Sequence, residues 1–375
     1  MVEGGIYKQR IIAFDLMRAI MLFLLIVFHA GISFMSSELD PESWLFKDQS
    51  THVVFDGLLA FIHTFRHPAF FVISGYVTHQ MFRRYSWSEV LNKRIKRLLI
   101  PMLSTLLLLG PMVQILLAQL MGVSEVFSLH IIFPPSKDYP FTISTLYVWF
   151  LYYLLIFSTA HLLLEKIGLA RFLKQVHFNK PWFLPSVIIL TIAVLVSLYQ
   201  WQQNSLFGQY YLLPELASLA GYFVFYLFGI FLGSKKNSLN KLADYGWYFV
   251  IIGVGAFVVY SLRGIQILQV DGKTMDFDLV LMISSALATV FFSFGFLGIA
   301  LRYYNKKNRI ITYVSRSSYF LYLIHFPVLL YFLKIGVAQD WNVFGKFFFV
   351  LGATCMVTVM LNALWLFLWK NKPPI

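Results

Sequence analysis

The chain has 375 residues, of which 59% are hydrophobic and 18% aromatic, and it carries a net charge of +13. A soluble core of this size does not need 39 Phe and 21 Tyr, and apolar runs close to twenty residues recur along the whole chain. Because about twenty apolar residues span a bilayer, the composition predicts a multi-pass membrane protein. The single cysteine, Cys355, excludes an internal disulfide.

Apolar runs between polar breaks predict ten membrane-spanning helices. They cover residues 17–36, 54–81, 98–121, 145–164, 182–200, 215–233, 246–262, 279–301, 317–335 and 344–369. The expected fold is an all-α integral membrane protein in which about ten helices form one bundle. Residues 1–375 are expected to be a single polytopic domain.

The basic residues divide sharply between alternate connections. Of the 30 Lys and Arg, 23 lie at the N-terminus up to Arg18, in segments 82–97, 165–181, 234–245 and 302–316, or after Trp369. Because cytoplasmic loops carry an excess of Lys and Arg, these segments and both termini are predicted to be cytoplasmic. The positive charge is thus a sign of topology, and nucleic acid is not an expected partner.

The first span, FDLMRAIMLFLLIVFH, begins near a charge and ends on an ionisable group. Ten uncharged residues separate Arg18 from His29, and this spacing places both on one helix face, with His29 about 16 Å deeper. His29 therefore lies near the middle of a core about 30 Å thick. An ionisable residue at that depth indicates a functional site. Arg18 could instead only snorkel to the surface.

The second span, VFDGLLAFIHTFRHPAFFVISGYVTHQM, carries His63, Arg66 and His67 at positions i, i+3 and i+4, on one face. Arg66 is about 18 Å from the outer end of the span, close to the depth of His29. Pro68 predicts a break in the helix beside this group. Each histidine could instead only form a hydrogen bond between helices, and Arg66 could be a structural clamp. The small residues Ser74 and Gly75 are typical of close helix packing or of a place where a cofactor passes.

Further candidates come from later spans. His325 lies in SSYFLYLIHFPVLLYF, directly before Phe326 and Pro327, and a buried histidine beside a kink is an equal alternative to a site role. Trp149 lies inside the fourth span, where aromatic packing is the simpler interpretation. Nothing in the sequence singles out the remaining histidines of the connections, which are His52, His130, His161 and His177.

The segment 83–102, RRYSWSEVLNKRIKRLLIPM, is the most basic inner connection and carries Arg94 and Arg97. Such a stretch usually contacts anionic lipid headgroups, and the alternative is a phosphate-bearing ligand in the cytoplasm. The chain has no Walker loop, GxGxxG, HExxH or Cys/His metal spacing, which argues against an ATP-driven pump, a Rossmann redox enzyme and a zinc protease. No metal is expected.

Five of these stretches together resemble the membrane-bound acyltransferase-3 family, and they occur in the family's order. They are FDLMRA with the spacing to His29, FFVISGY, RIKRLLIP, YVWFLYYL and FLYLIHFP. Within that family, FIHTFRHPAFFVISGY and the chain length are most similar to the glucan-biosynthesis branch. The resemblance implies an O-acyltransferase of the bacterial inner membrane that moves an acyl group from cytoplasmic acyl-CoA to a glycan hydroxyl at the outer face, with succinyl favoured and acetyl next.

The same resemblance implies roles for particular residues. The family's essential histidine corresponds to His29 and its arginine to Arg18, and His63 and Arg66 complete the implied catalytic set. Donor binding is implied for Arg18, Ser74, Arg94 and Arg97, and substrate contacts are expected for His67, Trp149 and His325. His67 stands where the branch has methionine, which leaves its role open.

A mechanism follows from these residues and from general chemistry. Attack of a hydroxyl on a thioester needs a base and a stabilised oxyanion, and His29 with Arg66 could supply them. The rival classes are a transporter or flippase for a glycan or lipid-linked sugar, which also needs polar groups at the midplane, and a structural membrane subunit. The acyl group, the acceptor, the oligomeric state and an acyl-enzyme intermediate are not decided by the sequence.

Overall fold

The structure is a computed structural model that describes residues 11–37, 46–122, 145–168, 183–202, 216–235, 237–270, 278–304 and 309–368. Over these ranges the chain is helical and contains no strand, which confirms the all-α class. Both chain ends, most of segments 122–144 and 165–181, part of 302–316, and His130 and His177 lie outside the described residues.

The described residues form twelve α-helices, and those between Trp87 and Leu120 make up one bent segment. In chain order they are α1 (Ile12–Gly31), α2 (Val53–Phe82), α3 (Trp87–Arg94), α4 (Ile100–Leu108), α5 (Gly110–Leu120), α7 (Trp149–Lys166), α9 (Phe183–Gln202), α10 (Leu216–Ser234), α11 (Ser238–Val270), α12 (Leu279–Tyr303), α13 (Arg309–Val337) and α14 (Val343–Leu368). The π-helical turn η3 (Ile95–Leu99) joins α3 to α4, and the 3₁₀ turns η2 (Ile32–Phe34) and η4 (Leu146–Val148) extend α1 and precede α7.

Seven of the described helices are long and apolar enough to cross a membrane, or eight if α3–α4 and α5, bent by 46°, count as one span. The chain is therefore a multi-pass membrane protein. Each of the ten predicted segments coincides with a helix or with this bent pair. However, α2 is less apolar because it carries Asp56, Arg66 and three histidines, and the apolar part of α9 is short. The count of ten crossings stays a prediction.

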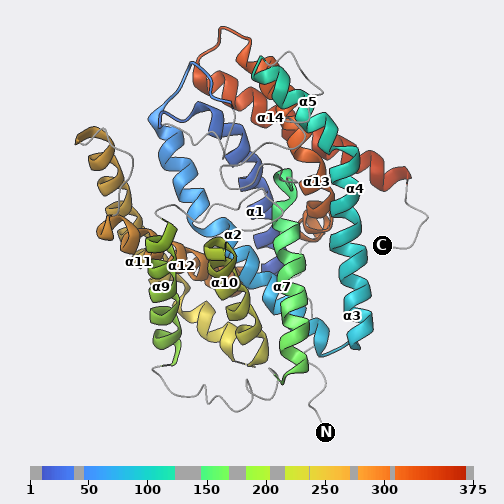
Figure 1. The fold of residues 1–375 in the computed structure, drawn as a ribbon, viewed down its shortest axis with the longest axis vertical. Coiled ribbons are helices and arrows are strands. Elements are labelled where there is room, and N and C mark those ends of the chain that lie inside the picture. Colours follow the sequence, from blue (N-terminus) through green and yellow to red (C-terminus); the bar gives the residue numbers. More distant parts are fainter. Residues whose placement is uncertain are drawn as a thin grey trace.

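Helices α1 and α2 lie inside the bundle. Helix α1 contacts α2, α12, α13 and α14, and α2 packs mainly against α10 and α12. Figure 1 shows α9 and α11 on one side of this pair and α3, α4 and α5 on the other. Helix α11 exposes a row of large apolar side chains, including Ile251, Val254, Val258 and Leu262, as expected of a surface that faces lipid tails.

The predicted break at Pro68 is wrong, because α2 continues through this residue from Val53 to Phe82. A proline inside a helix removes one hydrogen bond and costs about 3 kcal/mol or more. Pro68 is buried, and α1, α10 and α12 hold α2 from several sides. This packing offsets the local cost, and Pro327 is likewise inside an unbroken α13.

Glycines set the close approach of α2 to α10. A Cβ atom added at Gly75 would lie 2.0 Å from the carbonyl oxygen of Tyr226, and one added at Gly229 would lie 2.0 Å from that of Val72. The two glycines therefore let the backbones touch, as small residues do between membrane helices. For Gly75 this confirms the packing interpretation and leaves no space for a cofactor on that face.

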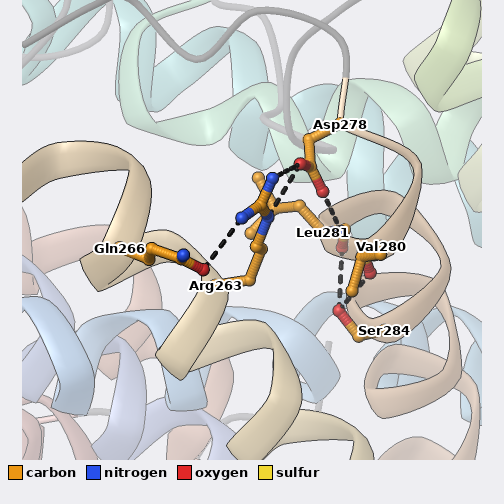
Figure 2. A network of polar contacts seen from close by, with 6 residues as sticks. All are labelled: Arg263, Gln266, Asp278, Val280, Leu281 and Ser284. Carbon is orange, nitrogen blue, oxygen red and sulfur yellow. Dashed lines mark hydrogen bonds and ion pairs between the residues drawn. The ribbon is translucent and has the colours of Figure 1, made fainter. Parts of the chain in front are cut away.

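One ion pair joins the ends of α11 and α12, as Figure 2 shows. Arg263 donates from Nε and Nη2 to Oδ2 of Asp278 at 2.8 and 2.6 Å, and from Nη1 to Gln266 at 2.8 Å. Asp278 also caps α12, because its Oδ1 accepts from the backbone N–H of Leu281. The hydrogen bonds from Arg263 hold the pKa of the Asp278 carboxyl below its usual value.

A second ion pair is buried at the start of α14. Lys346 donates to both carboxylate oxygens of Asp48 at 3.1 and 3.2 Å. Beside it is a hollow of about 340 Å³, which is lined by Asp48, Gln49, Ser50, Val337, Gln339, Asp340, Trp341 and Lys346. This mixture of polar side chains with one tryptophan lies on the side that the charge pattern assigns to the exterior.

Candidate active site

Helices α1 and α2 run antiparallel, and their contacts place the segments that carry His29 and His63 at one level. Near one end the ring of Phe14 lies 5.1 Å from that of Tyr76, and near the other Phe34 lies 5.8 Å from Phe55. Between these contacts the ring of Phe28 lies 5.7 Å from that of His63. The two histidine-bearing segments therefore lie at the same level of this helix pair, and their depth in the membrane stays a prediction.

His29 faces a third helix, α13. Its ring centroid lies 5.6 Å from that of His325 and 5.0 Å from that of Phe326. His325 is fully buried, although it comes from a helix almost 300 residues further along the chain. The helices α1, α2 and α13 thus converge on one histidine cluster, which we define as His29, His63, Arg66, His67, Trp149 and His325.

Arg66 is the charged member of this cluster. Its guanidinium lies 4.7 Å from the ring centre of Phe28, and the side chain is only 4% exposed. Its Nη2 is 3.0 Å from Nε2 of His67. Because arginine only donates, Nε2 of His67 accepts this bond, and a neutral His67 therefore carries its proton on Nδ1.

Aromatic side chains hold His67 in place from the other side. The ring of Trp149 lies 4.9 Å from that of His67, and Tyr222 of α10 lies 6.0 Å away. The Nδ1 atom of His67 is buried and has no hydrogen-bond partner among the described residues. The structure therefore brings His67 and Trp149 into the histidine cluster together with His325, the third predicted substrate-contact residue, and leaves a buried donor at His67.

Two tyrosines that the sequence analysis did not select fix His325. Nδ1 of His325 lies 2.6 Å from the carbonyl oxygen of Tyr322, so this nitrogen donates and the neutral ring keeps its lone pair on Nε2. The Tyr322 hydroxyl donates to the carbonyl of Tyr147 at 2.9 Å, and the Tyr147 hydroxyl donates to that of Leu323 at 2.6 Å. Tyr147 lies in the motif YVWFLYYL and Tyr322 in FLYLIHFP, and membership of these motifs was the sequence signal that could have identified them.

Arg18 lies on α1 away from the cluster and is partly exposed. Its Nη1 is 3.6 Å from Oδ1 of Asp15, and the same oxygen accepts from the Ser315 hydroxyl of α13 at 2.9 Å. The side chain of Arg18 is 27% exposed, against 3% for Asp15. Arg18 is thus oriented by a buried carboxylate on its own helix rather than left to extend freely.

The basic residues expected to bind the donor lie on a helix, which corrects the predicted connection. From Trp87 the chain is α3, started by a capping box between Ser86 and Glu89. Arg94 donates to the Thr78 hydroxyl and to the Met81 sulfur of α2, and Thr78 donates to the carbonyl of Ser74 at 2.7 Å. Arg97 is exposed.

These donor candidates form a second group along α2. Thr78 is twelve residues beyond Arg66, which is about 18 Å along a helix. Arg94, which donates to Thr78, is therefore separated from Arg66 by a distance that an extended substrate arm would have to cross, and Ser74 lies between Arg66 and Thr78 on α2. The cluster itself offers bases, a guanidinium and a buried N–H donor, the groups that acyl transfer to a hydroxyl requires.

Comparisons with known proteins agree with this chemistry. A family model described as an acyltransferase domain matches residues 11–363, and the chain belongs to this acyltransferase-3 family. Similar relatives are named glucans biosynthesis protein C. Those from the Escherichia coli strains SMS-3-5 and O1:K1 are 25% identical over 98% of this chain and 96% of their own length, and the one from strain ED1a is 24% identical with the same coverage. No solved structure matches the chain.

Proposed function

We propose that this protein moves an acyl group, succinyl first and acetyl next, from cytoplasmic acyl-CoA to hydroxyls of a periplasmic or cell-surface glycan. The observation that carries the proposal is the convergence of His29, Arg66 and His325 from three helices in a buried cluster. The names of the relatives support a glucan as acceptor. The proposed location is a bacterial inner membrane with both termini in the cytoplasm.

The proposed reaction uses His29 as the general base. It takes the proton of the sugar hydroxyl while the oxygen attacks the thioester carbonyl, and Arg66 and the adjacent His63 stabilise the oxyanion. When the tetrahedral intermediate collapses, the carbon–sulfur bond breaks and the CoA thiolate takes the proton from His29. The lone pair on Nε2 of His325 gives the cluster a second proton acceptor. This chemistry uses no metal.

The remaining contacts suit the two substrates. The N–H at Nδ1 of His67 is placed to bind the free carboxylate of a succinyl group, and Trp149 covers this side of the cluster. Arg18, Arg94 and Arg97 would hold the phosphates of CoA at the inner surface, with Ser74 beside the pantetheine arm. Membrane lipid surrounds the outer helices.

Acyl analysis of envelope glycans tests the proposal. Cells with the wild-type protein, with His29→Ala or with no protein are compared after equal amounts of protein have been verified in the membrane. We expect an ester that only the wild type produces, because loss of a general base lowers the rate by about 10²–10⁴-fold. The mass of the ester separates succinyl from acetyl. Identical esters in all three strains would refute the proposal and favour transport.

A further inference from the structure

A second group of ionisable side chains lies outside the histidine cluster, at the far end of α2. It consists of His79 in the last turn of α2 and of His161 and Glu165 on α7. His79 and His161 are buried, at 5% and 0% exposure, and the Glu165 side chain is 15% exposed. Nothing in the proposed reaction uses these residues.

Their ligand atoms converge on one point. Oε1 of Glu165 lies 3.4 Å from Nε2 of His161 and 3.7 Å from Nδ1 of His79, and all three atoms are within 4.8 Å of one another. The two imidazole rings are parallel, with an interplanar angle of 5° and centroids 6.0 Å apart. His161 and Glu165 are one helical turn apart, so α7 presents both on the same face.

Hydrogen bonding does not account for this arrangement. None of the three converging atoms has a hydrogen-bond partner among the described residues. A charged pair of imidazole and carboxylate closes to about 2.7–2.9 Å, and both observed distances are longer. Three buried polar atoms that face one another at ion-pair distance, but farther apart than ordinary hydrogen bonds, are poorly satisfied unless something occupies the space between them.

A divalent metal ion fits the two distances from Glu165 and the donor chemistry. Ligands about 2.0–2.1 Å from a tetrahedral zinc ion are about 3.3–3.4 Å apart, close to the two distances from Glu165. Two histidines and one glutamate are a zinc-binding set that leaves one position open. The Nδ1 atom of His161 lies 3.4 Å from the hydroxyl of Tyr226, the kind of outer contact that orients a ligating imidazole.

We propose that His79, His161 and Glu165 bind a divalent metal ion of the zinc class. The site fastens the end of α2 to α7, and through Tyr226 to α10. No pattern in the sequence indicates this site, because His79 lies far along the chain from the other two ligands and only the fold brings them together. The charges of Arg83 and Arg94 act on these imidazoles and oppose a cation, so we expect micromolar affinity rather than tighter binding.

Metal content and Co²⁺ spectroscopy test this site in the purified full chain in detergent. The wild type is equilibrated with micromolar Zn²⁺, desalted and measured by mass spectrometry, and Co²⁺ is added separately to record its ligand-field absorption. We expect about one Zn²⁺ per chain and an absorption typical of four-coordinate Co²⁺. A wild-type protein that retains no equimolar Zn²⁺ and gives only the spectrum of aqueous Co²⁺ overturns the proposal.

Variants separate this site from incidental binding. Glu165→Gln keeps the shape of the side chain but removes its charge, and His161→Ala removes a ligand, so each is expected to weaken Zn²⁺ binding more than tenfold. Tyr226→Phe is expected to weaken it about tenfold by freeing the His161 ring. His52→Asn is the control, because asparagine also caps a helix and His52 lies outside the site. Equal binding by the folded Glu165→Gln and control proteins would show adventitious metal only.

Discussion

At the scale of single residues, His67 distinguishes this chain within its predicted branch. The methionine expected there is only a weak acceptor for the hydrogen bond that Arg66 donates to Nε2, and it has no N–H to offer to a substrate. His67 thus changes both the support of the arginine and the polarity of the histidine cluster beside Trp149. A residue of this kind is suited to setting the choice of acyl group.

We predict that His67→Met shifts donor preference. Loss of one hydrogen bond to a charged carboxylate is expected to lower kcat/KM for succinyl-CoA by about 10–150-fold, while acetyl-CoA, which has no free carboxylate, is affected much less. The measurement compares both donors with the same glycan acceptor and purified protein. Equal losses for both donors would contradict the assignment and would point to general damage of the Arg66 environment.

At the scale of helices, the contact between α2 and α10 tolerates little change. We predict that Gly75→Ala destabilises the protein by about 1–3 kcal/mol or more, because the new methyl group meets a backbone carbonyl at 2.0 Å and the helices must separate. Thermal unfolding in detergent provides the measurement. Gly57→Ala is the matched control on the same helix, since a Cβ there has nothing within 4 Å. Similar melting temperatures for the two variants would contradict this prediction.

The ion pair between α11 and α12 makes a prediction about pH. Because the pKa of Asp278 is lowered in the folded protein, its contribution is present above the ordinary value of about 3.9 and is lost as the pH falls through the folded pKa. Asp278→Asn retains the helix cap but removes the charge, so we expect a loss of less than about 1 kcal/mol at neutral pH.

Melting temperatures of both proteins between neutral pH and about pH 3 test this. The difference between wild type and Asp278→Asn should be constant at neutral pH and shrink in acid as the wild-type carboxylate takes up a proton. A difference that stays constant throughout the range would show that the charge of Asp278 contributes nothing.

Sequence patterns predicted the helices well but missed how they meet. Each apolar run coincides with a helix or with the bent pair, because every segment that crosses a bilayer needs about twenty mainly apolar residues. The shared depth of His29 and His63 followed from counting along two antiparallel neighbours. Pro68 was misjudged because packing around α2 outweighs the local effect of proline. The contacts of His325 with His29 and of His79 with Glu165 depend on helix order in space, which hydropathy does not encode.

At the scale of the whole molecule, the number of membrane crossings decides which connections lie in the cytoplasm and which lie outside. We predict that residue 85, between α2 and α3, lies in the cytoplasm and that residue 340, between α13 and α14, lies outside, because ten crossings put seven between them. Single cysteines are introduced as Tyr85→Cys and Asp340→Cys after Cys355→Ser removes the native thiol. Both positions are exposed.

An impermeant maleimide gives the measurement. In spheroplasts it should label the Asp340→Cys protein, whereas the Tyr85→Cys protein should react only after the membrane is opened. Labelling of both from the same side would mean an even number of crossings between them, and the first segments to reconsider would be α9, whose apolar part is short, and the bent pair of α3–α4 and α5.

The row of imidazoles also has a bioenergetic consequence. His29 lies beside His325, and His63 lies beside His67. The location proposed for this cluster is a membrane that sustains a proton gradient, and neighbouring imidazoles can pass protons. Phe28 and Phe326 stand against these rings, and Trp149 closes the side at His67. In the proposed location these aromatic side chains would exclude water, so that a catalyst reached from both sides of the membrane does not become a leak that discharges the gradient.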